Sequence, residues 1–264
     1  MNAVDTTTIG TLHRTRVQAA IGTGKFVRPR PAIFMILLIA VVMASLRMFQ
    51  QVFAWKTGLD STLPAFDATW MLLLKSQLIV IPLLWVGTWS YLWATRDRHL
   101  DQLRPKDELR RYMTFVLWLL VYAFSVYFAG SLFAEQDASW HQTVVRDTSF
   151  TPSHIVLFYG TMPLYVTFGV GSFLYAMTRL PKFAARISIP LTLVVVGPFL
   201  ILPNLGYNEW GHAFWLMEEV FTAPLHWGFV VLGWSLVALA GLLVQVVQHL
   251  SELMVKVATE EKAT

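Results

Sequence analysis

The sequence contains no cysteine and few charged residues. Without cysteine the chain has no disulfide, no iron–sulfur cluster and no thiolate-bound metal. A metal site would therefore use histidine, carboxylate, amide or water ligands. Charged residues make up 14% of the 264 residues, whereas a soluble domain usually carries about a quarter. With 56% hydrophobic residues and a mean hydropathy of +0.55, the composition indicates a membrane protein.

Long apolar runs recur along the chain, and each is long enough to cross a hydrocarbon core of about 30 Å. A span in lipid must satisfy its own backbone hydrogen bonds, and the runs are continuous rather than alternating, so helices are favoured over a β-barrel. The predicted fold class is all-α, a polytopic membrane bundle of about six transmembrane helices. The predicted spans are 32–54, 68–94, 113–134, 154–178, 188–206 and 224–249.

The basic residues lie on one side of these spans, which predicts the orientation of the chain. Sixteen Lys and Arg residues fall in the segments on that side, and two fall in the segments on the other side. By the positive-inside rule both termini are cytoplasmic. This distribution also explains the net charge of +4 without nucleic-acid binding. The predicted regions are a polar basic cytoplasmic segment 1–31, a transmembrane helical domain 32–249 and a cytoplasmic tail 250–264.

Four of the seven histidines fall on the opposite, outer side, in two similar sets. In "DASWH", Asp137 precedes His141 by four residues, and His154 follows at the start of the next span. The second set repeats this spacing with an amide in place of the carboxylate, in "NEWGH" and "APLHWGF". Its members are Asn208, His212 and His226.

Side chains four residues apart lie on one face of a helix, so the first two members of each set are able to reach one metal ion. A third ligand from the neighbouring helix would complete the site. Two imidazoles and a carboxylate suit copper, non-haem iron or zinc. Two imidazoles and an amide, as in the set that includes Asn208, hold a metal less tightly. Glu209, Glu218 and Glu219 lie near this second set as supporting or alternative ligands.

Other interpretations of these residues remain open at this point. A single pair such as Asp137 and His141 also suits a hydrogen-bonded pair at the membrane surface, but two matching sets on one side favour a metal. Histidines also serve as axial ligands in haem- or quinone-binding membrane anchors. A transporter with intramembrane carboxylates is a third class, although the sequence shows no internal repeat.

Several other residues carry structural predictions. Pro152 and Ser153, just ahead of an apolar run, indicate the start of a helix. Tryptophans near span ends, Trp70 among them, are typical of an interfacial aromatic belt. Glycines in the fourth span permit close helix contact. These glycines are Gly160, Gly169 and Gly171.

Long stretches of the sequence resemble the C subunit of the copper membrane monooxygenases, the family of particulate methane monooxygenase, ammonia monooxygenase and short-chain hydrocarbon monooxygenases. They are "EQDASWHQTVVRDTSFTPSH", "LYAMTRLPKF", "ILPNLGYNEWGHAFWLMEEVF" and "APLHWGF", within about residues 45–235. The resemblance implies a first copper site at Asp137, His141 and His154. It also implies a second proposed copper site, formed by Asn208, His212 and His226.

The resemblance also implies an activity and partners. The complex would insert one oxygen atom of O2 into a small substrate, with copper as cofactor and quinol as the electron donor. The C subunit would assemble with A and B subunits as a trimer of heterotrimers in the bacterial inner or intracytoplasmic membrane, among its lipids. "DASWHQ", "RDTSFTPSH" and "YAMTRLP" are closer to ammonia monooxygenases, while methane and short-chain alkanes stay open as substrates.

Overall fold

The computed structural model of the chain describes residues 27–129, 132–133, 151–197 and 238–263. All regular secondary structure in these ranges is helical. Four helices among the described residues are long and apolar enough to cross a membrane, and they confirm the predicted class and the first four spans. They are Arg30–Thr57, Pro64–Ala94, Pro105–Ala129 and Pro152–Arg179.

The first two spans are joined by a short turn. Helix α2 (Arg30–Thr57) starts with a proline in its first turn, where the missing backbone N–H is harmless. After the turn come α3 (Pro64–Phe66), a π-helical turn η1 (Asp67–Met71) and α4 (Leu72–Ala94). Helix α2 and the continuous helical segment Pro64–Ala94 are both longer than the predicted spans 32–54 and 68–94, because hydropathy marks only the apolar part of a helix.

Helix α5 (Pro105–Ala129) begins inside the segment 95–112 that the sequence predicts as a cytoplasmic loop. The loop is therefore shorter than predicted, with one 3-10 turn at Leu100–Gln102. The reason is local, since α5 starts with Pro105 and has Asp107 and Glu108 in its first turn. Acidic residues there interact favourably with the positive end of the helix dipole.

The fourth span is a continuous helical segment made of α7 (Pro152–Val156), a second π-helical turn η4 (Leu157–Thr161) and α8 (Met162–Arg179). It starts at the predicted proline. Within its most apolar window 67% of the residues are buried, against 17% in α2, so it forms the centre of the bundle. Helices α4 and α5 pack along α8, and α2 packs along α5.

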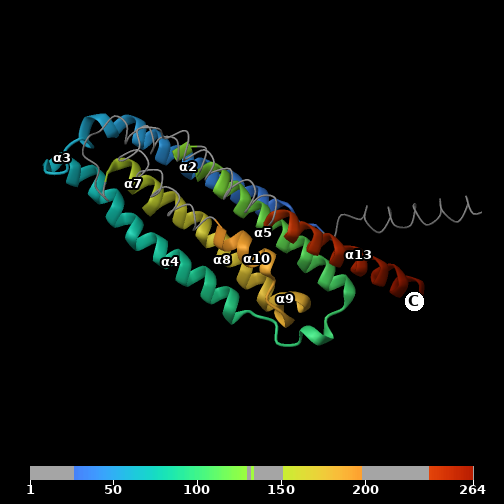
Figure 1. Ribbon diagram of the computed structural model, residues 1–264. Helices are drawn as coiled ribbons and strands as arrows, with labels where there is room; N and C mark the ends of the chain where they lie inside the picture. The colour runs from blue at the N-terminus through green and yellow to red at the C-terminus, as the bar shows by residue number, and fades with distance from the viewer. Residues whose placement is uncertain (1–26, 130–131, 134–150, 198–237, 264) are drawn as a thin grey trace, which may run out of the picture.

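The long helices run side by side, which gives the bundle two distinct ends (Figure 1). One end carries α3 and the start of α7, and we call it the α7 end. The other carries α9 (Pro181–Ala185), the connection between α4 and α5, and the described end of the chain; we call it the α9 end. The sequence predicts that the α7 end faces outward.

Close contact at the centre of the bundle depends on glycine, as predicted for the fourth span. A Cβ at Gly169 would lie 2.9 Å from the ring of Tyr122, too close for a real contact. The buried Tyr122 hydroxyl donates to the carbonyl oxygen of Val194, at 2.9 Å. Val194 belongs to α10 (Ile189–Val196), so this one tyrosine ties α5, α8 and α10 together.

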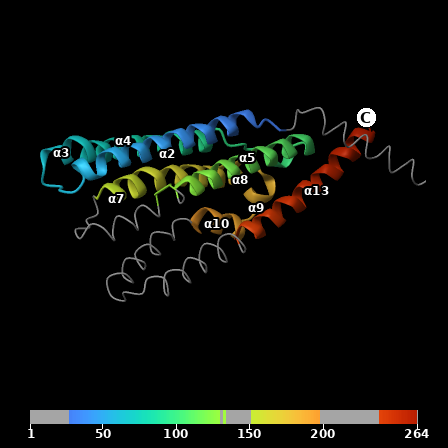
Figure 2. The ribbon, with the colours of Figure 1, turned by 90° about the horizontal axis from the view of Figure 1, so that it is seen from above.

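The last described helix, α13 (Ala240–Ala263), packs against α5 and α10 (Figure 2). Ser188, which caps α10, donates to Gln245 Oε1 at 2.6 Å. The helix runs through most of the predicted tail 250–264, so that segment is helical rather than irregular. Residues 198–206 and 224–237 of the last two predicted spans lie outside the described residues, so the count of six and the orientation of the termini stay predictions.

Candidate functional site

His154 is the one predicted copper ligand that lies within the described residues. It sits in the first turn of α7, which begins with Pro152 after Thr151 in an extended conformation. The imidazole is 8% exposed and lies 4.8 Å, centroid to centroid, from the ring of Phe158. The fold therefore holds this histidine inside the α7 end of the bundle, largely shielded from solvent.

The other five predicted ligands lie outside the described residues: Asp137, His141, Asn208, His212 and His226. The structure therefore leaves both predicted copper sites as predictions. Within the described part of the chain, no three His, Asp or Glu side chains lie close enough together to hold a metal ion.

The start of α7 is held by close contact with the turn after α2. A Cβ at Gly58 would lie 2.5 Å from Cγ of Pro152 and 3.1 Å from Nε1 of Trp70. A larger residue at Gly58 would therefore push α7 or the indole of Trp70 away. Gly58 is thus needed for the position of the helix turn that carries His154.

Two π-helical turns lie at this end of the bundle. The turn η1 (Asp67–Met71) precedes α4, and η4 (Leu157–Thr161) follows the turn that carries His154. Helix α4 packs against both η4 and α8. We call the contact of α4 with η4 and α8, together with the adjoining turn η1, the α4–α8 interface. Single π turns are rare and occur frequently at functional sites, which makes this part of the interface a candidate.

Polar side chains at this end of the α4–α8 interface lack partners. Five buried side-chain atoms have no hydrogen-bond partner among the described residues, and three of them belong to Trp70 and Gln77. The indole Nε1 of Trp70 is one, and the two amide atoms of Gln77 are the others. The hydroxyls of Tyr112 and Ser172 complete the set. Trp70 is fully buried, so it is not part of an interfacial aromatic belt, and that prediction is wrong for this residue.

In the half of the interface nearer the α9 end, two tryptophans are hydrogen bonded to α8. Trp85 donates its indole N–H to the hydroxyl of Thr167, at 3.0 Å, and to the carbonyl oxygen of Pro163, at 3.2 Å. Trp89 donates to the carbonyl oxygen of Thr167, at 3.4 Å. These bonds join the half-buried indoles of α4 to α8, so the two tryptophans have a structural role.

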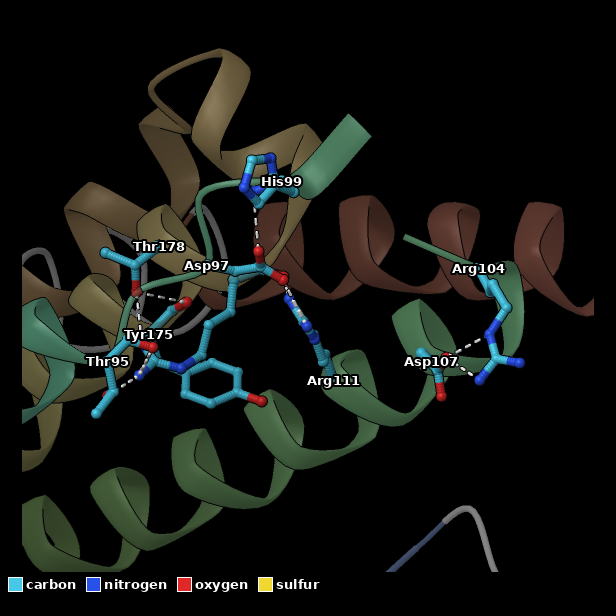
Figure 3. Close-up of polar contacts among 9 residues, drawn as sticks. Thr95, Asp97, His99, Arg104, Asp107, Arg111, Tyr175 and Thr178 are labelled. Carbon is cyan, nitrogen blue, oxygen red and sulfur yellow. Dashed lines mark hydrogen bonds and ion pairs between the residues drawn. The ribbon is translucent and has the colours of Figure 1, made fainter. Parts of the chain in front are cut away.

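The α9 end itself is closed by ion pairs and capped carbonyls (Figure 3). Asp97 accepts from the backbone N–H of His99, at 2.9 Å, and pairs with Arg111, at 2.7 Å. These two contacts lower the pKa of the Asp97 carboxyl below its usual value, the backbone hydrogen bond first. Arg179 donates to the carbonyl oxygens of Leu92 and Thr95, at 3.1 and 3.2 Å. This cluster joins α4, α5 and α8.

Helix α13 is attached at the same end. Lys182, in α9, pairs with Glu252 at 2.5 Å and approaches Nδ1 of His249 at 2.9 Å. The hydrogen bond from Lys182 lowers the pKa of Glu252. The ring of His249 lies against Tyr112, 5.9 Å between centroids. The arrangement joins α5, α9 and α13, so its role is structural.

The sequence did not single out Gln77, although its burial and its unpartnered amide make it prominent in the structure. The available signal was a polar residue within a predicted span, directly after Lys75 and Ser76, with a glycine in the fourth span. Hydropathy cannot distinguish a glutamine that faces lipid from one that faces another helix. Only the packing of α4 on η4 shows which applies.

The helices and the buried histidine define a multi-span helical membrane protein with a histidine buried at one end of its bundle. A model of the family of C subunits of ammonia monooxygenase and methane monooxygenase matches residues 14–257, and the chain belongs to this family. The match confirms the resemblance and extends it toward both ends of the chain. It makes the chain a subunit of a membrane monooxygenase complex. A comparison with curated proteins found no match.

Proposed function

We propose that this chain is the copper-binding C subunit of a membrane monooxygenase. The complex would insert one oxygen atom of O2 into ammonia, methane or a short-chain alkane. The observation that carries the proposal is the buried His154 at the α7 end, in a chain that belongs to the C subunit family. Histidines buried within membrane proteins are rare and are usually functional.

The donor set fits copper. The residues proposed to hold the ion are Asp137, His141 and His154, with two imidazoles and one carboxylate, a set that suits copper and leaves positions open. Bound copper would supply redox chemistry with O2. A second, weaker site is proposed at Asn208, His212 and His226.

The described residues support the proposed ligand. Contact with Phe158 and burial in α7 restrict the orientations of the His154 ring. Burial also excludes bulk water from the imidazole, and an environment of this kind strengthens electrostatic interactions. Gly58 and Pro152 fix the helix turn on which His154 lies.

We propose A and B subunits as partners, in a trimer of heterotrimers in the bacterial inner or intracytoplasmic membrane, with quinol as the electron donor. Large apolar side chains on α2 and α4 are exposed in the single chain, which supports contact with lipid and other subunits. They include Phe34, Val41, Ile79, Leu83 and Val86.

The test is metal analysis of the purified complex together with oxidation assays on ammonia, methane, ethane and butane. His154→Ala should lose copper and most activity. A matched control is His99→Ala, because His99 lies in the connection at the α9 end and alanine keeps the backbone N–H that donates to Asp97. Full activity and unchanged copper in His154→Ala would contradict the proposal. A Soret band in the wild-type complex would favour a haem-binding anchor instead.

A further inference from the structure

Trp70 and Gln77 present unpartnered polar groups along one side of the α4–α8 interface. They are seven residues apart, Trp70 in the π-helical turn η1 and Gln77 in α4. Trp70 is fully buried and Gln77 is 8% exposed. Among the described residues neither the indole N–H nor either amide atom of Gln77 has a hydrogen-bond partner.

The contacts of these two groups flank the helix turn that carries His154. The indole nitrogen of Trp70 lies at the Gly58–Pro152 contact, just before His154. The amide of Gln77 lies against Gly160 in η4, after His154, where a Cβ would be only 2.6 Å from Nε2. Gly160 therefore gives the amide room to lie against the π-helical turn.

An amide buried in this way destabilises the protein compared with an apolar side chain of the same shape, because it loses its hydrogen bonds to water. In the other half of the interface the half-buried indoles of Trp85 and Trp89 both have partners on α8. A methionine would fill the volume of Gln77 without that loss. The unpartnered amide of Gln77, beside the turn that carries His154, therefore keeps its donors and its acceptor for a molecule that binds there.

The chemistry of the amide defines that molecule. Gln77 offers N–H donors and a carbonyl acceptor and carries no charge, so it fits a small neutral molecule with both a donor and an acceptor. Every product of the proposed oxygenation has a hydroxyl group with both, and ammonia has both as well, whereas an alkane has neither. Resting on the proposed function, we infer that Gln77 binds the hydroxylated product beside the turn that carries His154.

The experiment uses Gln77→Met in the purified complex, with Gln50→Met as the matched control. Gln50 is also buried, 3% exposed, but its Oε1 accepts from Nη1 of Arg47 at 3.2 Å. The readouts are inhibition of turnover by added product and the melting midpoint. Ethanol is the probe when ethane is oxidised, and hydroxylamine is the probe when ammonia is oxidised.

Gln77→Met should raise the product inhibition constant about tenfold, as expected for one lost hydrogen bond of ordinary strength. It should leave the melting midpoint unchanged or higher. The KM for ethane should stay within about twofold of the wild-type value, because ethane makes no hydrogen bond. If Gln77 bound the substrate ammonia rather than the product, Gln77→Met would change the KM for ammonia instead. Gln50→Met should lower the midpoint and leave product inhibition unchanged.

Gly160→Ala provides a second variant that keeps the glutamine. Its new methyl group would displace the flexible end of Gln77 from η4. It should therefore weaken product inhibition about as much as Gln77→Met does. The double variant should show no further loss, because both changes remove one contact and their effects are not additive.

Unchanged product inhibition in Gln77→Met would overturn the inference, and so would a change in the KM for ammonia alone. A fall in its melting midpoint equal to that of Gln50→Met would also overturn it, because the amide would then have a structural partner. Absence of copper or of oxidation in the wild-type complex contradicts the proposed function. In that case the midpoint comparison still decides whether the amide of Gln77 is bonded within the protein.

Discussion

The two halves of the α4–α8 interface carry similar polar side chains but differ in their hydrogen bonds. Toward the α9 end, Trp85 and Trp89 donate to groups on α8. Toward the α7 end, Trp70 and Gln77 have no partner among the described residues and lie next to π-helical turns. A helix pair that needs only stability satisfies its buried polar groups. The comparison therefore separates two half-buried tryptophans that join α4 to α8 from two buried side chains whose polar groups join nothing among the described residues, although Ser172 on α8 is unpartnered there as well.

The largest expected difference between the two ends is in copper and activity. His154→Ala should lose the copper of the first proposed site, and its activity should fall by more than about 100-fold. Removing a residue that only supports a metal ligand costs up to about 100-fold, and removing the ligand itself should cost more. His99→Ala at the α9 end should keep both. Metal analysis and oxidation assays on the same preparations measure the outcome, and an equal loss in both variants would remove the distinction between the ends.

At the α9 end the expected effect is on stability. Arg111→Met leaves Asp97 without its ion pair and should lower the free energy of unfolding by about 1–2 kcal/mol, after allowance for partial exposure. Thermal unfolding in detergent measures this loss, while copper content should not change. A loss of copper in Arg111→Met would show that the α9 end is coupled to the proposed metal site.

The Asp97 pair also predicts a pH dependence. The pKa of Asp97 is lower in the folded state than its usual value of 3.8. The ionised carboxylate therefore contributes its full stabilisation of the folded state at pH values above 3.8. This stabilisation is lost as the pH falls through the lower pKa that Asp97 has in the folded state. The stability difference between the wild type and Asp97→Asn should therefore be constant near neutral pH and shrink below about pH 4. A constant difference down to about pH 2 would contradict the assignment.

A pair of tryptophan substitutions compares the two halves of the interface directly. Trp85→Phe removes a bonded indole and should destabilise the complex by about 1 kcal/mol. Trp70→Phe removes an indole N–H that has no partner among the described residues, so its effect should be smaller or opposite in sign. Melting midpoints of the two variants provide the measurement. Equal losses would show that the halves do not differ.

The smallest effect is expected where α13 meets α9. Lys182→Met removes the pair with Glu252, which is largely exposed, so the pair contributes little and is screened by salt. The melting midpoint should fall by less than in Arg111→Met, and the difference should vanish in high salt. A salt-independent loss would indicate that the contact with His249, rather than the ion pair, holds α13.

Much of the fold was predictable because its signals are local. Hydropathy located the first four spans, and Pro152 marked the start of the helix that carries His154. The close approach at Gly169 also followed from the sequence, since the absence of a side chain allows helices to meet. The start of α5 at Pro105 was missed, because charged residues continue a helix beyond the apolar part of a span.

The candidate site was predictable only in part. The spacing of Asp137, His141 and His154 indicated a metal site. The resemblance to the C subunit of the monooxygenases, now confirmed, identified the metal as copper, which remains a proposal. Gln77 carried no such signal. Its importance depends on Gly160, which is 83 residues away in the chain and adjacent in space.

The sequence by itself determined the membrane class, the positions of the long helices and the family of the chain. The reason is that bilayer thickness and backbone hydrogen bonding act on each segment separately. Only the tertiary structure decided which side of each helix is buried, because an apolar side chain is equally compatible with lipid and with a neighbouring helix. It placed Trp70 in the core rather than at the membrane surface, and it placed Gln77 without a partner among the described residues, beside the turn of His154.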